Sequence, residues 1–374
     1  QWVDAADQKS FAVTNPTTTK VIAHVPSVST AQVEHAVEAA DEALKTWKLT
    51  TAKERSILLK KWYQLMVEHQ EDLAIILSTE QGKSITESRG EILYGASFIE
   101  WFAEEAKRTY GDVIPHDKQG RRLVVIRQPV GVVAAITPWN FPNAMITRKV
   151  GPALAAGCTV VIKPASETPL SALALVALAE QAGIPKGVVN VVTGSAREIG
   201  AVLTSHPAVK KVSFTGSTQI GKLLMEQCSS TMKKVSMELG GNAPFIVFDD
   251  ADLDRAVDGA IASKFRNSGQ TCVCTNRILV QDKIYDAFIE KLAIAVKKLK
   301  VAPAFEQGAE QGPLINEKAV EKIQEHIADA TAKGAKIVVG GQRHALGQTF
   351  FEPTVLADVT PEMLVAKDET FGPL

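Results

Sequence analysis

Two cysteines one residue apart form the first group in the sequence that could do chemistry. Cys272 and Cys274 follow a polar stretch, whereas Cys158 and Cys228 lie among apolar residues, where a cysteine is usually a small inert hydrophobe. A thiolate at the pair would be a nucleophile. A zinc site would need more ligands, with no histidine nearby in the sequence, and a disulfide between residues two apart would be strained. The pattern leaves open a reactive thiol and a pair of packing residues.

Charged residues of three further segments could act on a substrate. Glu238 ends an apolar run and precedes two glycines, which suits a general base but also fits a solvated charge. Arg148 and Arg266 could each hold a carboxylate through two parallel hydrogen bonds, although most arginines are surface charges. Each of the two arginines alone is a weak signal.

A glycine-rich segment, residues 216–223, nearly matches the phosphate loop GxxxxGK followed by Ser or Thr. The match fails at Leu223, which replaces the hydroxyl that would bind Mg²⁺. The segment still suits an anion at a helix N-terminus, or a plain turn between strand and helix. A phosphate-loop nucleotidase therefore stays as an alternative. The GxGxxG dinucleotide fingerprint follows no predicted strand, so a standard Rossmann cofactor pose has no direct support.

Helices are predicted for the first third of the chain. Ser29 with Gln32, and Thr51 with Glu54, fit the capping-box pattern that begins a helix. Apolar residues recur at helical spacing after both boxes and again over residues 86–110.

Strands then alternate with helices, which predicts βαβ units and a parallel sheet. The expected strands cover residues 132–136, 159–162, 188–192, 212–214 and 235–237, and a second α/β region follows with strands near 245–248, 278–280 and 337–339. Ligands bind at the carboxyl ends of parallel strands. The polar and glycine residues that directly follow the strands are therefore candidates for a site: Asn140, Lys163, Gly194, Gly216 and Glu238.

Composition excludes several classes of protein. The chain has 374 residues, and 41 Lys and Arg against 42 Asp and Glu give a charge of −1, so nothing favours nucleic acid or an anionic membrane as partner. No apolar run reaches the roughly 20 residues that cross a bilayer. Four cysteines are too few for a secreted disulfide framework, which favours the cytoplasm. Because the chain begins without Met and ends inside a motif, we expect missing sequence at the C-terminus and allow for a lost targeting peptide.

Six segments, in this order, resemble the aldehyde dehydrogenase family: TPWNFP at 137–142, KPAS at 163–166, FTGST at 214–218, ELGG at 238–241, GQTC at 269–272 and ETFGP at 369–373. AMITRKVGP at 144–152 and KFRNSGQTCVC at 264–274 resemble its NADP-type succinate-semialdehyde subgroup. The resemblance implies an α/β fold with a parallel-sheet dinucleotide-binding domain (1–110 and 129–240), a bridging hairpin (111–128) that builds homodimers or homotetramers, and an α/β catalytic domain (241–374) whose C-terminal part is missing.

The resemblance also implies a mechanism. Cys272 would attack the aldehyde, Asn140 would stabilise the oxyanion, and Glu238 would activate the water that hydrolyses the thioester. The cofactor would contact Ile136, Thr137, Pro138, Trp139, Lys163, Ser166, Gly194, Phe214, Gly216, Ser217, Leu239, Glu369 and Phe371, and no metal is implied. Ser166 predicts NADP over NAD, because it replaces a carboxylate that would repel a 2′-phosphate.

For the substrate, Arg148 and Arg266 match positions that grip a distal carboxylate. This implies oxidation of succinate semialdehyde to succinate, with glutarate semialdehyde or a broader range of aldehydes as the alternative. A non-catalytic relative is a further alternative, which retention of Cys272, Glu238 and Asn140 disfavours. Cys274 beside the nucleophile suggests a reversible redox switch or, equally, simple packing.

Overall fold

A computed structural model describes residues 2–374, which divide into two compact units. Unit 1 comprises residues up to Val13, Ala23–Ile76 and Arg89–Glu238, and unit 2 comprises Thr14–Ile22, Leu77–Ser88 and Leu239–Leu374. Four elements contribute residues to both units: β1 (Ser10–Thr14), β2 (Val21–Pro26), α3 (Gln70–Gln81) and α4 (Ile85–Glu105).

Unit 1 is built around a five-stranded parallel sheet in the order β7-β6-β5-β8-β9. Its strands are β5 (Val132–Ile136), β6 (Thr159–Lys163), β7 (Val189–Val191), β8 (Val209–Thr215) and β9 (Lys234–Glu238). α3 and α4 belong to unit 1 in part. Its other helices are α1 (Thr30–Trp47), α2 (Ala52–Glu68), α5 (Ala144–Ala155), α6 (Pro169–Gln181), α7 (Ala196–Ser205), α8 (Thr218–Ser229) and the 3-10 turn η1 (Ala106–Arg108). The five strands and their parallel arrangement confirm the prediction from sequence.

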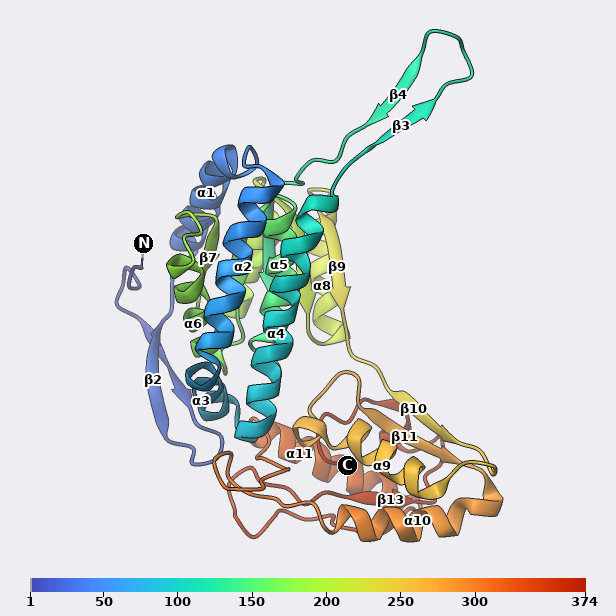
Figure 1. The fold of residues 1–374 in the computed structure, drawn as a ribbon. Coiled ribbons are helices and arrows are strands. Elements are labelled where there is room, and N and C mark those ends of the chain that lie inside the picture. Colours follow the sequence, from blue (N-terminus) through green and yellow to red (C-terminus); the bar gives the residue numbers. More distant parts are fainter. Residues whose placement is uncertain (1) are drawn as a thin grey trace. The chain divides into compact units, whose positions relative to one another are not determined.

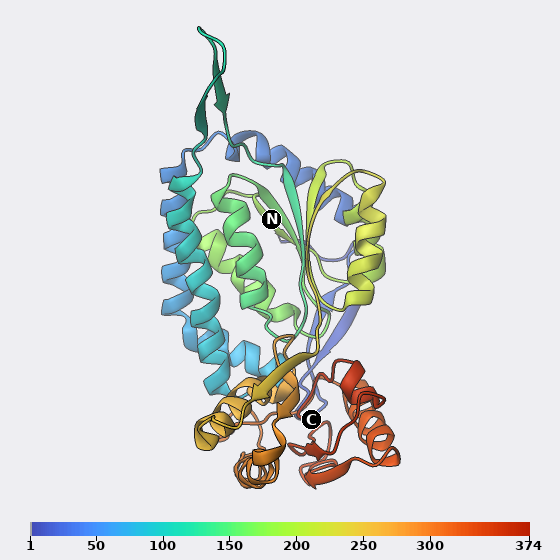
Figure 2. The same ribbon diagram turned by 90° about the vertical axis from the view of Figure 1, so that its right-hand side faces the viewer.

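Helices cover both faces of this sheet (Figure 2). On one face, Val33 of α1 and Leu203 of α7 belong with Ala134 of β5 to one cluster of fully buried side chains. On the other face, α5 and α6 contact β5, β6 and β7, and α2 packs on both helices. Burial on both faces explains why β5 and β6 read as continuous apolar runs.

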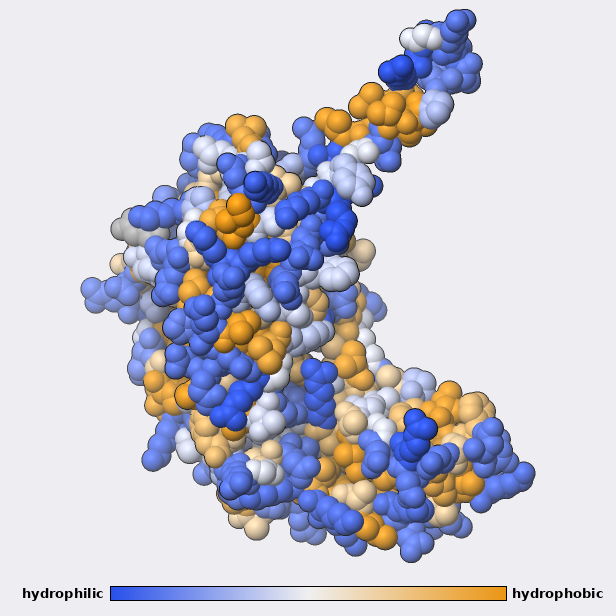
Figure 3. Space-filling model, in the orientation of Figure 1, coloured by the Kyte–Doolittle hydropathy of each residue, from blue (hydrophilic) through white to orange (hydrophobic). Residues whose placement is uncertain are grey.

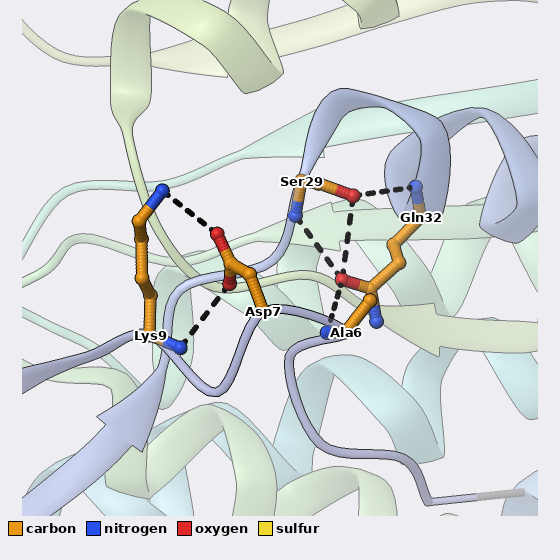
Figure 4. Close-up of polar contacts among 5 residues, drawn as sticks. All are labelled: Ala6, Asp7, Lys9, Ser29 and Gln32. Carbon is orange, nitrogen blue, oxygen red and sulfur yellow. Dashed lines mark hydrogen bonds and ion pairs between the residues drawn. The ribbon is translucent and has the colours of Figure 1, made fainter.

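Both predicted capping boxes are present. At the start of α1, the Ser29 side chain accepts the Gln32 backbone N–H, and the Gln32 side chain accepts the Ser29 N–H. Figure 4 shows that the same Gln32 oxygen also accepts the Ala6 N–H, at 3.0 Å, which attaches the N-terminal segment to the helix. Thr51 and Glu54 repeat the box at α2.

An antiparallel hairpin extends from the body of unit 1 (Figure 1). It consists of β3 (Asp112–Pro115) and β4 (Arg122–Val125), and lies within the predicted range 111–128. All residues of the two strands are exposed, and apolar side chains gather along it (Figure 3).

Unit 2 contains a parallel pair, β10 (Ala243–Val247) and β11 (Thr275–Val280), and an antiparallel pair, β12 (Lys336–Val339) and β13 (Val355–Ala357). Its helices are α9 (Leu253–Lys264), α10 (Asp282–Val296), α11 (Glu317–Ala332), α12 (Leu364–Lys367) and the 3-10 turn η2 (Arg266–Gly269). Phe265, Phe288 and Leu292 form a core between β10, α9 and α10, and Ile323 and Phe351 belong to a second core around α11.

The units differ from the expected domain bounds at two short segments. Residues Thr14–Ile22 and Leu77–Ser88 group with unit 2, although they were expected in the first domain. Pro16 accepts a hydrogen bond from Thr349, and a Cβ on Gly82 would lie 2.8 Å from both Pro16 and Pro313. These contacts join residues far apart in the sequence, so no local pattern could indicate them.

Candidate active site

The carboxyl edge of the unit 1 sheet gathers residues that the sequence singled out. The residues that directly follow β5 and β8 bond to the last residues of the neighbouring strands. The Thr137 N–H donates to the Lys163 carbonyl at 3.1 Å, and the Gly216 N–H donates to the Glu238 carbonyl at 3.1 Å. Register pairs Ile136 with both Lys163 and Phe214. The chain segments that leave four neighbouring strands therefore begin side by side, as the strand-end argument predicted.

The turn between β8 and α8 is shaped for an anion. Ser217 is the N-cap of α8, and its side chain accepts the Ile220 N–H. A Cβ at Gly216 would lie 2.5 Å from the Phe214 ring, so only glycine allows this close packing. The remaining N–H groups of the first helical turn can bind phosphate oxygens. Leu223 lies on α8 with an exposed aliphatic side chain, which provides no Mg²⁺ ligand for a nucleotidase.

Two buried hydroxyls at this edge have no hydrogen-bond partner among the described residues, namely those of Thr137 and Thr215. Buried polar groups are nearly always hydrogen-bonded in folded proteins, so such groups point to a ligand. Lys163 is also buried here, and burial lowers the pKa of its amine while the charge of Glu167 opposes the shift. Unpartnered donors, a buried cation and a helix N-terminus fit a dinucleotide. Ser166 is half-buried in the loop that follows Lys163, and Gly194 has a φ of +136° in the loop after β7.

Asn140 is buried in the loop between β5 and α5. That loop is fixed at both sides: Thr168 donates to the Trp139 carbonyl at 3.5 Å, and the Glu91 carboxylate accepts the N–H groups of Asn143 (2.9 Å) and Ala144 (3.2 Å). A carboxylate at this point also interacts favourably with the positive end of α5. No sequence pattern indicates that Glu91 caps a helix so far away in the chain.

Lys149 is a second residue that sequence reasoning missed. It lies on α5, is buried, and donates to the Ser213 hydroxyl of β8 at 3.2 Å. Burial lowers the pKa of its amine to about 8, and the negative charge of Glu238 opposes this shift. Glu238 itself is exposed at the end of β9. A lysine among the apolar positions of a predicted helix was the available signal.

Arg148 is held in a defined orientation on α5. It donates to the Tyr94 hydroxyl at 2.5 Å, and its guanidinium carbon lies 5.7 Å from the Tyr94 ring centroid and 4.9 Å from the Phe98 ring centroid. Its buried Nε has no partner among the described residues. A guanidinium held against two neighbouring rings, with one donor unused, is suited to bind a planar anion.

Cys272 and Cys274 differ in their surroundings in unit 2. Cys272 is half-buried on the segment between η2 and β11. Cys274 is buried, and its sulfur accepts the Thr271 hydroxyl at 2.8 Å and donates to the Lys264 carbonyl at 3.1 Å. Lys264 is fully enclosed, and burial lowers the pKa of its amine to about 8. Of the two thiols, Cys272 is the more accessible.

Glu369 packs against the glycines that follow Leu239. A Cβ at Gly240 would lie 2.4 Å from the Glu369 carboxylate, so a larger residue there would displace this side chain. One carboxylate oxygen, Oε1, is buried without a hydrogen-bond partner among the described residues. Burial raises the pKa of Glu369, which the Gly241 N–H and the charge of Lys322 oppose. Arg266 is exposed and Phe371 is half-buried.

The candidate residues are thus divided between the two units. Unit 1 carries Ile136, Thr137, Pro138, Trp139, Asn140, Arg148, Lys163, Ser166, Gly194, Phe214, Gly216, Ser217 and Glu238, and unit 2 carries Leu239, Arg266, Cys272, Cys274, Glu369 and Phe371. Among residues 2–374, no group of three or more His, Cys, Asp or Glu side chains is arranged to hold a metal ion. None of the described helices combines the length and the apolar character that crossing a membrane requires.

A parallel sheet whose carboxyl edge suits a dinucleotide, and an accessible cysteine elsewhere on the chain, are parts that a nicotinamide-dependent oxidoreductase with a cysteine nucleophile would need. The sequence model described as the aldehyde dehydrogenase family matches residues 2–374. The chain belongs to that family, which confirms the resemblance noted in the sequence.

Three comparisons give the degree of similarity. The chain is 64% identical to the 3-sulfolactaldehyde dehydrogenase of Pseudomonas putida over 373 residues, which covers 100% of this chain and 77% of that protein. It is 60% identical to the NADP(+) succinate-semialdehyde dehydrogenase GabD of Escherichia coli over 374 residues, which covers 100% of this chain and 78% of that protein. A crystal structure of an aldehyde dehydrogenase from Brucella melitensis biovar abortus 2308 superposes with a TM-score of 0.99 at 61% identity, covering 100% and 77%.

Proposed function

We propose that the protein oxidises succinate semialdehyde to succinate with NADP as preferred cofactor and NAD as a possible one. The observation that carries the proposal is the Arg148 guanidinium, fixed by Tyr94 and Phe98 with an unused donor on the helix that follows Asn140. The names of the Escherichia coli and Pseudomonas putida relatives describe aldehydes with an acidic group, and the former names NADP. Glutarate semialdehyde, one methylene longer, is the alternative substrate.

Each catalytic step is assigned to a residue of this chain. The Cys272 thiolate adds to the carbonyl carbon and forms a thiohemiacetal, whose oxyanion the Asn140 amide and the Cys272 N–H stabilise. NADP, when bound, supplies the acceptor for the hydride. Oxidation leaves a thioester on Cys272, and Glu238 takes a proton from the water that hydrolyses it to the carboxylate. Half-burial of Cys272 and exposure of Glu238 leave both groups able to meet a reactant.

The test measures NADPH formation from succinate semialdehyde, glutarate semialdehyde and butanal with the full-length protein. Turnover with both semialdehydes, well above that with butanal, is the expected result. Turnover with butanal alone would contradict the substrate assignment. ATP hydrolysis would favour the nucleotidase, and a folded but inactive protein would favour the non-catalytic relative.

Ser166→Glu is expected to reverse the cofactor preference. A new carboxylate about 4 Å from the 2′-phosphate of NADP would be disfavoured by about 4 kcal/mol per charge pair at an effective dielectric constant near 20. Ser166 follows the buried Lys163, whose positive charge favours the phosphate. We expect kcat/KM with NADP to fall by at least about thirtyfold, given screening, while kcat/KM with NAD is retained. Initial rates with both cofactors measure this.

Ser166→Gln is the matched control, because it adds the same bulk without charge. The Gln variant should still have a higher kcat/KM with NADP than with NAD. If the Glu variant kept the NADP preference, or if Gln changed it as much as Glu, the electrostatic explanation of the cofactor choice would fail.

We propose that the exposed hairpin of β3 and β4 joins copies of the chain into a homodimer or homotetramer. Val113 and Val124 are 67% and 66% exposed, and Ile126 beside the hairpin is 68% exposed. An isolated two-stranded hairpin is marginally stable in water, and a contiguous apolar surface usually marks an interaction site.

Val124→Lys is accordingly expected to shift the protein to monomers, because it buries an unpaired charge at the interface. Light scattering coupled to gel filtration measures the mass. Arg122→Lys, a charge-conserving change in the same strand, should leave the assembly intact. A monomeric wild type at micromolar concentration would refute the proposal.

We also propose that the protein resides in the cytoplasm. The support is the cysteine content: four in 374 residues, all of them described and all of them free thiols. Fractionation of cells that express the full-length protein, followed by the activity assay, would decide this.

A further inference from the structure

A strained turn leads to Cys272. Asn267 (φ 51°, ψ 39°) and Ser268 (φ 54°, ψ 36°) adopt the left-handed conformation, and Gly269 follows with φ 71°. For residues other than glycine this conformation is disfavoured about five- to thirtyfold each, although Asn tolerates it best. Consecutive left-handed residues therefore persist only where their surroundings hold them.

The carboxylate of Glu87 is one such constraint. Its Oε1 accepts the backbone N–H of Asn267 at 2.6 Å. Its Oε2 lies 3.4 Å from the Ser84 hydroxyl, which in turn accepts the Glu87 N–H at 3.3 Å at the beginning of α4. One side chain thus joins the start of a helix to the turn that precedes the nucleophile, and all of these residues belong to unit 2.

Side chains hold the same turn from other directions. Gln81 donates to the Asn267 side-chain oxygen at 3.1 Å, and the Asn267 amide donates to the Gln270 carbonyl at 3.3 Å. The Ser268 hydroxyl donates to the Gly312 carbonyl at 3.0 Å. A Cβ at Gly269 would lie 2.0 Å from the Gly372 carbonyl oxygen, so the backbone there is tightly enclosed.

The bond from Asn267 to Glu87 is the shortest of these contacts, at 2.6 Å, and its acceptor is a carboxyl oxygen. Hydrogen bonds to an ionised acceptor are roughly twice as strong as neutral ones. Burial raises the pKa of Glu87, while the charges of Lys83 and Arg266 and the Asn267 N–H oppose the shift and favour the carboxylate. An anion in such an enclosed place is costly unless its bonds are well made.

We infer that Glu87 is a positioning residue for the nucleophile, since its carboxylate fixes the turn 267–269 and thereby the place of Cys272. The inference rests on the proposed role of Cys272. Glu87 acts through the backbone, so its loss should slow every reaction of the Cys272 thiol, including reactions that involve no aldehyde.

The experiment compares Glu87→Ala and Glu87→Gln in the full-length protein, with Glu100→Gln, an exposed position of the same helix, as the matched control. The rate of Cys272 alkylation by iodoacetamide, followed by peptide mass spectrometry, is measured beside kcat, KM and the thermal midpoint. In Glu87→Ala, loss of a hydrogen bond to a charged group should lower both the alkylation rate and kcat about 10- to 150-fold. The KM should change less than about threefold.

Glu87→Gln should be intermediate, because its amide oxygen still accepts the Asn267 N–H but without charge. A general loss of stability would lower the thermal midpoint. Slower alkylation in a Gln variant whose thermal midpoint matches the wild type would therefore come from the position of Cys272. If both Glu87 variants alkylated within twofold of the wild type, the inference would be overturned. Should the Ala variant not fold, the Gln variant alone decides. Because alkylation requires no aldehyde, failure of the proposed substrate would leave this result intact, whereas labelling of other cysteines only would refute the role of Cys272.

Discussion

Replacing Cys272 with alanine is expected to lower NADPH formation from succinate semialdehyde by at least about a thousandfold, because a covalent mechanism has no substitute for its nucleophile. Of the four cysteines, all of them described, Cys158, Cys228 and Cys274 are buried, and only Cys272 is accessible. Burial also raises the pKa of Cys158 and Cys228, which disfavours their thiolates. Initial rates at saturating substrate measure the loss, and an unchanged thermal midpoint shows that the variant is folded.

Cys274→Ala is the matched control from the same segment. It removes a buried thiol bonded to Thr271 and the Lys264 carbonyl, so we expect some loss of stability but a kcat within about tenfold of the wild type. A Cys272→Ala variant that retained activity comparable to this control would exclude Cys272 as the nucleophile.

The same control tests whether the two cysteines form a redox switch. Peroxide would oxidise both thiols to a disulfide and be reduced to water, and a strained bond of this kind is readily reduced by a dithiol. The proposed switch requires that dithiol restore activity in the wild type but not in Cys274→Ala, where oxidation of Cys272 alone would proceed further. Equal recovery in both would assign Cys274 to packing only.

Much of unit 1 was predictable because its determinants are local. The capping boxes at Ser29 and Thr51 each lie within four residues, and the apolar runs of β5 and β6 are continuous. The parallel topology then follows from the alternation of strands and helices, and it places Lys163 and Glu238 at one edge. Chemistry at that edge could therefore be anticipated from the order of the elements alone.

The unpredicted features depend on contacts across long stretches of chain. Glu87 meets Asn267, and Glu91 meets Asn143, through hydrogen bonds that no sequence period encodes. The left-handed turn is likewise invisible, because Asn267 and Ser268 are common loop residues. Lys149 could have been noticed as a charge among apolar helical positions. The sequence does not indicate its partner, Ser213 on β8.

The largest change in specificity is expected from the two arginines. A hydrogen-bonded contact to a charged group contributes about 1.5–3 kcal/mol, so Arg148→Ala should lower kcat/KM for succinate semialdehyde about 10- to 150-fold. Butanal has no carboxylate for Arg148 to bind, so its kcat/KM should change less than about threefold. The ratio of kcat/KM for the two aldehydes, measured for Arg148→Ala, Arg266→Ala and the double variant, is the readout.

Arg255→Ala, an exposed arginine of α9, is the control for a general effect of lost charge and should leave the ratio unchanged. Arg148→Lys separates charge from geometry. A lysine keeps the positive charge but cannot donate through a planar fork while packing on the Phe98 ring, so recovery should be partial. Full recovery would mean that charge alone selects the substrate.

Arg148 is oriented in the folded chain before any substrate binds, so little conformational freedom is lost when it binds a carboxylate. Tyr94 accepts a hydrogen bond from the Arg148 guanidinium, which also packs on the Tyr94 and Phe98 rings. Tyr94→Phe keeps the ring but removes the hydroxyl that accepts from Arg148, and should reduce selectivity for the semialdehyde by less than Arg148→Ala does. If the double arginine variant preferred succinate semialdehyde over butanal as strongly as the wild type, neither arginine could be the carboxylate site.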